Sequence, residues 1–155
     1  MNHKIALSVI FLVLGTSKAF AAADLPDIKA GLWESRTTMG DAKNIMSSSC
    51  MDNSVYKKVS DDMENNPNRP CKVLQKERNG STYSSEVECK FGNKVSRSKT
   101  IINFSGNTAY HSEVRGSDNK VELVIDSKYA GACPTGMKLG DVTGPNGLKI
   151  NMMQK

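Results

Sequence analysis

The side chains of this chain that are best suited to chemistry lie around one histidine. His111 and Glu113 alternate along one strand-like segment, and Glu122 and Asp126 alternate along the next. A hairpin with a four-residue loop over 116–119 places Glu113 directly across from Glu122. His111 then lies diagonal to Glu122 and Asp126. An imidazole among carboxylates can bind a metal ion or hold a proton, so these four residues are the candidate metal ligands.

The opposite face of the same hairpin is apolar and favours an interpretation without a metal. Its expected cross-strand pairs are Val114 with Val121, Ser112 with Leu123, and Tyr110 with Ile125. If these pairs face the core, the histidine points to solvent, where Arg115 and Lys120 can offset the carboxylates. We therefore expect no bound metal and no other cofactor.

The sequence offers little support for catalysis. A serine or cysteine nucleophile needs a base nearby, and apart from His3 the chain has only His111, which is expected on a solvent-facing strand. Asp61 and Asp62 are neighbours on a predicted helix, where adjacent side chains do not face each other. The glycines near the C-terminus do not have the spacing of a phosphate-binding or dinucleotide-binding loop. We expect a protein that is not an enzyme.

The four cysteines of the chain predict two disulfides. Cys50, Cys71, Cys89 and Cys133 include no pair separated by only two residues, which argues against a redox-active pair and against zinc ligation by paired cysteines. An even number of cysteines in an exported chain is typical of a disulfide framework.

The turn chemistry around Asn79 helps to choose the pairing. A three-residue hairpin loop over 79–81 places Cys71 opposite Cys89 and Val73 opposite Val87. Apolar patterning and cysteine geometry then agree on the register, and the remaining two cysteines form the other bridge. The alternative pairing stays open at this point: Cys50 with Cys71, and Cys89 with Cys133.

Most of the chain shows the alternation of β-strands. The expected strands are 32–39, 45–51, 71–78, 82–91, 94–104, 108–115 and 120–129. One helix is expected after Asp52–Ser54, which supply capping side chains, because Val55, Val59 and Met63 form one apolar stripe. Short turns with Asn and Gly make neighbouring strands antiparallel. The fold class is mainly β: an antiparallel meander that forms a curved sheet or partial barrel, with one short covering helix and two disulfides.

The first 23 residues have the layout of a cleavable secretory signal. Lys4 precedes an apolar run over Ile5–Leu14, and small residues follow at Ala19–Ala23. This run is too short to cross a membrane, so no transmembrane segment is expected. We expect a signal peptide over 1–23, followed by a single disulfide-stabilised β-rich domain over 24–155.

The charge of the chain does not indicate nucleic-acid binding. The formal net charge is +5, and loss of Lys4 and Lys18 with the signal peptide lowers it to +3. The remaining cations are spread along the chain and aromatic residues are few, whereas nucleic-acid binders gather cations and stacking rings on one face.

Two motifs give the chain a family resemblance. Gly-Leu-Trp-Glu stands at 31–34, and Gly-Ala-Cys-Pro-Thr-Gly-Met-Lys-Leu-Gly-Asp stands at 131–141. Both resemble a family of small exported bacterial proteins of unknown function, although Leu139 stands where that family often has proline. The resemblance implies a periplasmic location and a disulfide-stabilised antiparallel sheet, and it transfers no activity. Trp33 in the first motif is either a core anchor or an exposed aromatic contact.

These observations predict a non-enzymatic periplasmic binding or envelope-accessory protein that holds an apolar ligand or a protein partner. A curved sheet with one covering helix can leave a groove for such a ligand. The alternative is an inhibitor of an exported hydrolase such as a lysozyme. Ser105-Gly106 before Tyr110 resembles the loop of periplasmic lysozyme inhibitors, but the spacing is one residue too long. A positive net charge is also the wrong sign for binding a basic enzyme.

Overall fold

In the residues that the structure describes, alternating side chains and tight turns form one antiparallel sheet of nine strands. The computed structural model describes residues 24–40, 44–65 and 70–154. The strands are β1 (Gly31–Met39), β2 (Ile45–Met51), β3 (Cys71–Asn79), β4 (Thr82–Phe91), β5 (Lys94–Ser105), β6 (Ala109–Arg115), β7 (Val121–Gly131), β8 (Asp141–Thr143) and β9 (Lys149–Asn151). Their order in the sheet is β3-β4-β5-β6-β7-β1-β2-β8-β9. The predicted fold class is confirmed.

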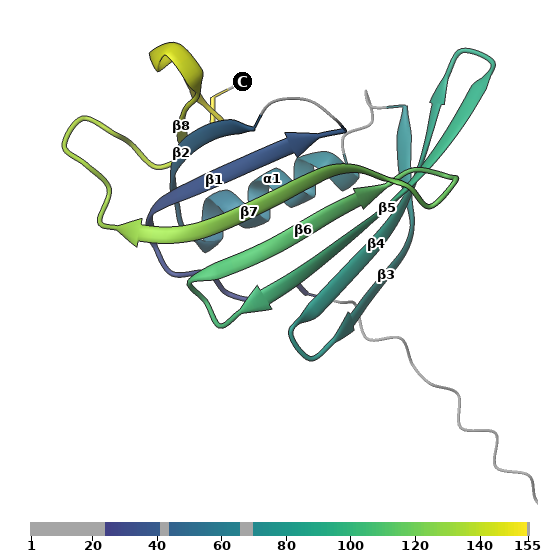
Figure 1. Cartoon of the computed structure of the whole chain (residues 1–155), viewed down its shortest axis with the longest axis horizontal. Coiled ribbons are helices and arrows are strands. Elements are labelled where there is room, and N and C mark those ends of the chain that lie inside the picture. The colour runs from purple at the N-terminus through teal and green to yellow at the C-terminus, as the bar shows by residue number, and fades with distance from the viewer. Residues whose placement is uncertain (1–23, 41–43, 66–69, 155) are drawn as a thin grey trace, which may run out of the picture.

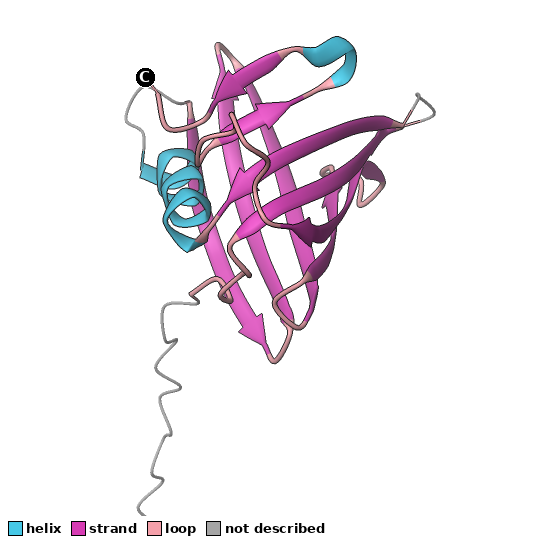
Figure 2. Cartoon of the chain, turned by 90° about the vertical axis from the view of Figure 1, so that its left-hand side faces the viewer, coloured by secondary structure: helices cyan, strands magenta, loops and turns pink. Residues whose placement is uncertain are grey.

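The sheet is open and curved, and helix α1 lies across its concave face. Helix α1 (Asn53–Asn65) follows β2 directly, and a short 3-10 turn, η1 (Pro145–Gly147), joins β8 to β9. Figures 1 and 2 show the strands bending around one side of α1. Strands β3 and β9 form the two edges. The N-terminal strand β1 lies inside the sheet, because it pairs with β7 on one side and with β2 on the other.

The start of α1 is capped as the sequence predicts. Asp52 accepts hydrogen bonds from the Val55 amide at 3.0 Å and from the Ser54 hydroxyl at 2.6 Å. These bonds, with that of Ser54 the stronger influence, lower the pKa of the Asp52 carboxyl. Val55 is fully buried and Val59 packs against the core, so the predicted stripe faces the sheet. The side chain of Met63 lies outside the described residues.

Trp33 is the centre of the core. It is fully buried, and its ring centroid lies 5.8 Å from that of Tyr110 and 6.3 Å from that of Tyr129. Its indole nitrogen donates a hydrogen bond of 2.9 Å to the carbonyl oxygen of Lys29. The buried apolar cluster consists of Ile28, Trp33, Met51, Val55, Tyr83 and Phe104. Trp33 is therefore a core residue and not an exposed aromatic contact.

The first disulfide hairpin confirms the predicted pairing and corrects its turn. Cys71 is bonded to Cys89, and Val73 lies opposite Val87. The loop, however, has two residues and not three, since Asn79 pairs directly with Thr82. A β-bulge after Val73 takes up the extra residue and restores the expected register at the cysteines. The second predicted bridge, Cys50–Cys133, is also present.

The register predicted for the hairpin of β6 and β7 is wrong by two residues. Ser112 lies opposite Ile125 and not Leu123, and Glu113 lies opposite Val124 and not Glu122. An irregularity between Val114 and Arg115 accounts for one residue of this shift. The other comes from the loop, which spans 116–120 and not 116–119, since Arg115 pairs with Val121. Because side chains alternate with a period of two, a shift of two keeps every residue on its predicted face. The new register also separates the two glutamates, which removes a like-charge pair.

The C-terminal segment, which the sequence left without strands, adds β8 and β9 to the sheet. Gly140 donates its amide to the carbonyl oxygen of Cys50 at 2.8 Å, next to the Cys50–Cys133 bridge. The buried Asp141 carboxylate accepts hydrogen bonds from the Lys138 amide at 2.8 Å and the Asn151 amide group at 2.7 Å. It also pairs with Lys149 at 2.7 Å. These contacts hold the pKa of Asp141 well below its usual range, the Lys138 amide most of all.

The two sequence motifs meet where β1 begins and β7 ends. Leu32 of the first motif pairs with Cys50 on one side and with Gly131 of the second motif on the other. Gly31 has φ +145°, and a Cβ added there would lie 2.2 Å from the Gly131 carbonyl oxygen. Only glycine fits this crossing, because any side chain would meet backbone that cannot move aside.

We predict that Gly31→Ala destabilises the protein far more than Gly80→Ala. Gly80 also has a positive φ, but open space surrounds it, so alanine there costs about 1–2 kcal/mol. Alanine at 31 adds the steric conflict with Gly131, worth about another 1–3 kcal/mol. Denaturant unfolding of the oxidised variants measures both costs. Equal costs at the two positions would contradict the close crossing.

Candidate functional site: a groove between the helix and the sheet

The N-terminal segment before β1 forms one wall of a groove beside α1. Asn53 at the start of the helix accepts a hydrogen bond from the Ile28 amide and donates one to the Asp27 carboxylate, both at 2.8 Å. Ile28 is buried in the core. Hydrogen bonds therefore hold the segment against the helix, and the Ile28 side chain anchors it in the core. This arrangement places Leu25 over the space between α1 and the sheet.

An inner cavity of about 160 Å³ lies under the helix. It is lined by Leu25, Tyr56, Val59, Ser60, Val73, Tyr83, Ser85, Val87, Thr100 and Ile102. Most of these side chains are apolar or aromatic, and the polar ones carry hydroxyl groups and no charge. An engineered apolar cavity of about 150 Å³ holds a benzene molecule, so this space fits a ring or a short alkyl chain.

An outer cavity of about 330 Å³ continues the inner one toward the surface. The two share Leu25, Tyr56, Ser60 and Tyr83. Charged side chains surround the outer part: Asp24, Asp27, Lys57, Asp61 and Lys76. We call the two cavities together the helix–sheet groove. Its outer part alone falls within the range of about 300–1,000 Å³ that is typical of small-molecule sites.

Burial raises the pKa of the Tyr56 phenol, so that it stays neutral even in alkaline solution. Tyr56 lines both cavities, and its removal from water raises the pKa of its hydroxyl, with Tyr110 and Tyr83 adding to the effect. A neutral phenol can donate and accept hydrogen bonds. The Tyr56 hydroxyl thus provides a hydrogen-bonding group between the apolar inner cavity and the charged mouth of the groove.

Small inward side chains on two strands make room for the groove. On β4, Ser85 stands between Tyr83 and Val87 on the inner face, and on β5 Thr100 pairs with Ser85. Larger residues at these two positions would reach the helix and fill the space. The sequence analysis predicted a groove from the fold class but did not identify Ser85 and Thr100 as part of its lining. Small hydroxyl residues at inward-facing strand positions could have indicated them.

The predicted metal ligands lie on the opposite, convex face of the sheet. His111 sits directly across from Asp126, and its Nδ1 lies 2.7 Å from the Asp126 carboxylate. Its Nε2 lies 3.5 Å from Glu113, whose other carboxylate oxygen accepts a hydrogen bond from Arg115. Glu122 does not join them and lies beside Gly116. Within the described residues, no group of three or more such side chains is arranged to hold a metal ion.

The contacts of His111 favour its protonated form. The hydrogen bond to Asp126, more than any other influence, raises the pKa of His111. Arg115 in turn lowers the pKa of Glu113, with a smaller contribution from His111. The arrangement is an ion-pair network in which both imidazole nitrogens face carboxylates.

The segment that resembles a lysozyme-inhibitor loop does not present its tyrosine. Ser105 ends β5 and Gly106 lies in the following turn, whereas the ring of Tyr110 packs against Trp33 and Phe104 in the core. Hydrolase inhibition stays a prediction, and no contact in the structure favours it.

The fold and the groove define the class of the protein. It is a small protein with a curved antiparallel sheet, two disulfides, and one helix that packs on the sheet beside a groove. This chain belongs to the family described as "Protein of unknown function (DUF3617)", whose family model matches residues 28–133. The matched region contains all four cysteines and most of the groove. The resemblance noted from the two motifs to a family of unknown function is confirmed.

Two further comparisons gave no match. Neither the search of curated proteins nor the search of solved structures found a match to the chain. In the part of the chain that the structure describes, no helix is long and apolar enough to cross a membrane.

We predict that the pairing of His111 with Asp126 stabilises the protein at acidic pH. Because the pKa of His111 is raised in the folded state, the stabilisation is complete below about pH 6.5 and is lost as the pH rises through the folded pKa. The melting temperature of Asp126→Asn should therefore fall below that of the wild type at pH 5.5 and approach it above pH 8.

The pKa of His111 itself can be read by NMR, since no other histidine follows residue 23. It should lie above about 6.5 in the wild type and return toward that value in Asp126→Asn. Glu113→Gln is the matched control and should shift the pKa less, because Glu113 lies farther from the ring. An identical pKa in the wild type and in Asp126→Asn would refute the pairing.

Proposed function

We propose that this protein is an exported, periplasmic binding protein that holds an apolar ligand in the helix–sheet groove without catalysing a reaction. The observation that carries the proposal is the inner cavity, which is lined by apolar and aromatic side chains and continues into a wider, charged mouth. Two disulfides support an oxidising compartment. The predicted signal peptide over 1–23 lies outside the described residues.

The gradient of polarity along the groove fits an amphiphilic ligand. An alkyl chain or ring in the inner cavity would bury apolar surface, which contributes about 25 cal/mol per Å². A polar head would stay at the mouth, where Lys57 and Lys76 stand with Asp24, Asp27 and Asp61. Cations and carboxylates together suit a dipolar or zwitterionic head better than one with a single charge.

Native mass spectrometry of the protein recovered from its own cell envelope tests this function. The sample is kept without reductant, so that both disulfides stay intact. A bound mass of a few hundred daltons that disappears on denaturation supports the proposal. Recovery of the bare chain in repeated preparations, with no uptake of added amphiphiles, would refute it.

A pair of neighbouring serines provides a sharper test by mutation. Ser85 lines the inner cavity, whereas Ser84 is adjacent on β4 and points to the other face of the sheet. We expect Ser85→Leu to fill the cavity and to weaken binding of a naphthylamine fluorescent probe at least tenfold. Ser84→Leu should bind the probe like the wild type.

Stability measurements separate cavity filling from misfolding in this test. Ser85→Leu should keep a cooperative thermal transition, because leucine enters existing space instead of displacing neighbours. Equal probe binding by both variants would place the probe somewhere other than in the groove.

A further inference from the structure

The hairpin of β4 and β5 ends in a tip that projects from the sheet and exposes apolar side chains. Figure 1 shows these two strands continuing beyond the neighbouring ones at the upper right. Phe91 at the end of β4 is 61% exposed, and Val95 near the start of β5 is 58% exposed. Few large apolar side chains in the described residues are more exposed, and these two lie at one hairpin end.

Each exposed apolar side chain of the tip has a lysine directly across the hairpin. Phe91 pairs with Lys94, and Val95 pairs with Lys90. Because opposed residues share a face, each face of the tip carries one apolar side chain and one cation. We call Lys90, Phe91, Lys94 and Val95 the basic tip.

Among the ion pairs of the described residues, none includes Lys90 or Lys94 of the basic tip. The chain has no acidic residue from Cys89 to Lys99. The two glutamates farther down β4 are already engaged. Glu88 pairs with Lys72 at 3.3 Å and with Arg97 at 2.9 Å, and Glu86 pairs with Lys99 at 3.5 Å.

The base of the tip is held in place. The Cys71–Cys89 disulfide joins β3 to β4 two residues before Phe91. The amide of Lys90 donates a hydrogen bond of 2.6 Å to the carbonyl oxygen of Pro70. The tip is thus presented by a rigid support, so that little conformational entropy is lost when it binds a surface.

The tip also lies in line with the helix–sheet groove. Val87 lines the inner cavity, and Cys89 and Phe91 follow it on the same face of β4. The inner face of one strand therefore leads from the groove to the exposed phenylalanine.

We propose that the basic tip docks into the surface of an anionic lipid bilayer, with Phe91 and Val95 among the acyl chains and Lys90 and Lys94 at the anionic headgroups. Paired apolar and cationic side chains match the apolar and anionic layers of such a surface. The inference builds on the proposed function, because it gives the membrane as the place where an amphiphilic ligand is taken up or delivered. Its test varies tip residues that line neither cavity of the groove, so the two proposals can fail separately.

Another exposed apolar site serves as the control. Leu148 and Ile150, before and within the edge strand β9, are 69% and 57% exposed. The cation between them, Lys149, is paired with the buried Asp141 carboxylate. This site has apolar exposure like that of the tip but lacks its unpaired lysines.

Co-sedimentation of the oxidised protein, residues 24–155, with lipid vesicles tests the proposal. Vesicles with one third phosphatidylglycerol should bind the protein, whereas pure phosphatidylcholine vesicles should not, and binding should weaken with salt. Each lysine at an anionic surface contributes about fivefold to partitioning, so Lys90→Gln with Lys94→Gln should lower it about 25-fold. Phe91→Ser should lower it about tenfold, and Ile150→Ser should leave it unchanged.

A spectroscopic variant reports insertion directly. In Phe91→Trp, the emission of the new indole should shift to shorter wavelength on anionic vesicles, while the fully buried Trp33 gives a constant background. Absence of vesicle binding would overturn the proposal. Binding that depends on the lysines but not on Phe91 would also overturn it, because it would indicate adsorption to any polyanion. Binding that is lost only in Ile150→Ser would overturn it as well, because the contact would then lie at β9.

Discussion

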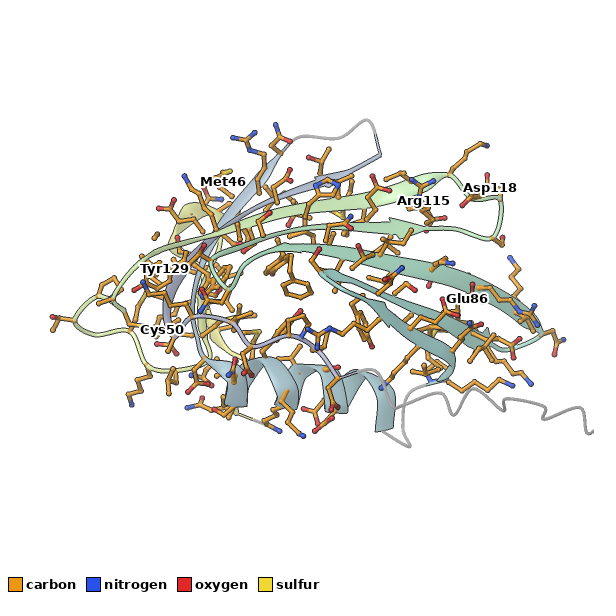
Figure 3. All side chains as sticks on the ribbon, turned by 90° about the horizontal axis from the view of Figure 1, so that it is seen from below. Met46, Cys50, Glu86, Arg115, Asp118 and Tyr129 are labelled. Carbon is orange, nitrogen blue, oxygen red and sulfur yellow. A yellow bond between two sulfur atoms is a disulfide. The ribbon has the colours of Figure 1, made fainter. Side chains whose placement is uncertain are left out.

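The structure depends on how one helix covers the concave face of a sheet that is much wider than the helix. Helix α1 has 13 residues, too few for a stable isolated helix, and is held by packing against the strands. Trp33 and two tyrosines fill part of the space between helix and sheet. Beside them the inner face carries hydroxyl groups that bond to one another, as Ser35 and Ser127 do at 2.8 Å. Figure 3 shows the helix set apart from the sheet with side chains between them. The groove is the part of this space that the core does not fill.

The convex face differs, because no described element of the chain covers it. Its strands carry opposite charges next to one another, and Glu88 between Lys72 and Arg97 is the clearest case. His111 belongs to this pattern: it stands across from Asp126 as a cation would. Such pairs add little stability each, but they keep a broad open sheet polar on the outside. The edge strand β3 has similar protection, since its bulge and its charged side chains hinder pairing with another sheet.

Local patterns in the sequence predicted the helix, strands β1 to β7 and one hairpin register, but they missed β8 and β9 and failed where the chain deviates from regular pairing. The cap at Asp52 and the pairing of Cys71 with Cys89 depend on residues close in sequence, and both were found. The bulges after Val73 and at the end of β6 have no strong sequence signal, so the first loop length and the second register were wrong. The groove could not be assigned to residues, because its lining combines the N-terminal segment, the helix and three strands. Contacts between such distant parts depend on the tertiary arrangement and not on any periodicity.

The central position of β1 sets the order in which the chain can fold. β1 is the first strand to be synthesised, yet one of its two partners, β7, is among the last. The Cys71–Cys89 hairpin closes a span of 18 residues, whereas Cys50–Cys133 closes a span of 83. Pairings between distant segments form slowly, since a long loop must close before they gain any energy. The sheet therefore cannot be completed until nearly the whole chain is available. If the chain is exported, as proposed, this delay keeps it unfolded, and able to thread through a narrow channel, until its C-terminal strands have emerged on the other side.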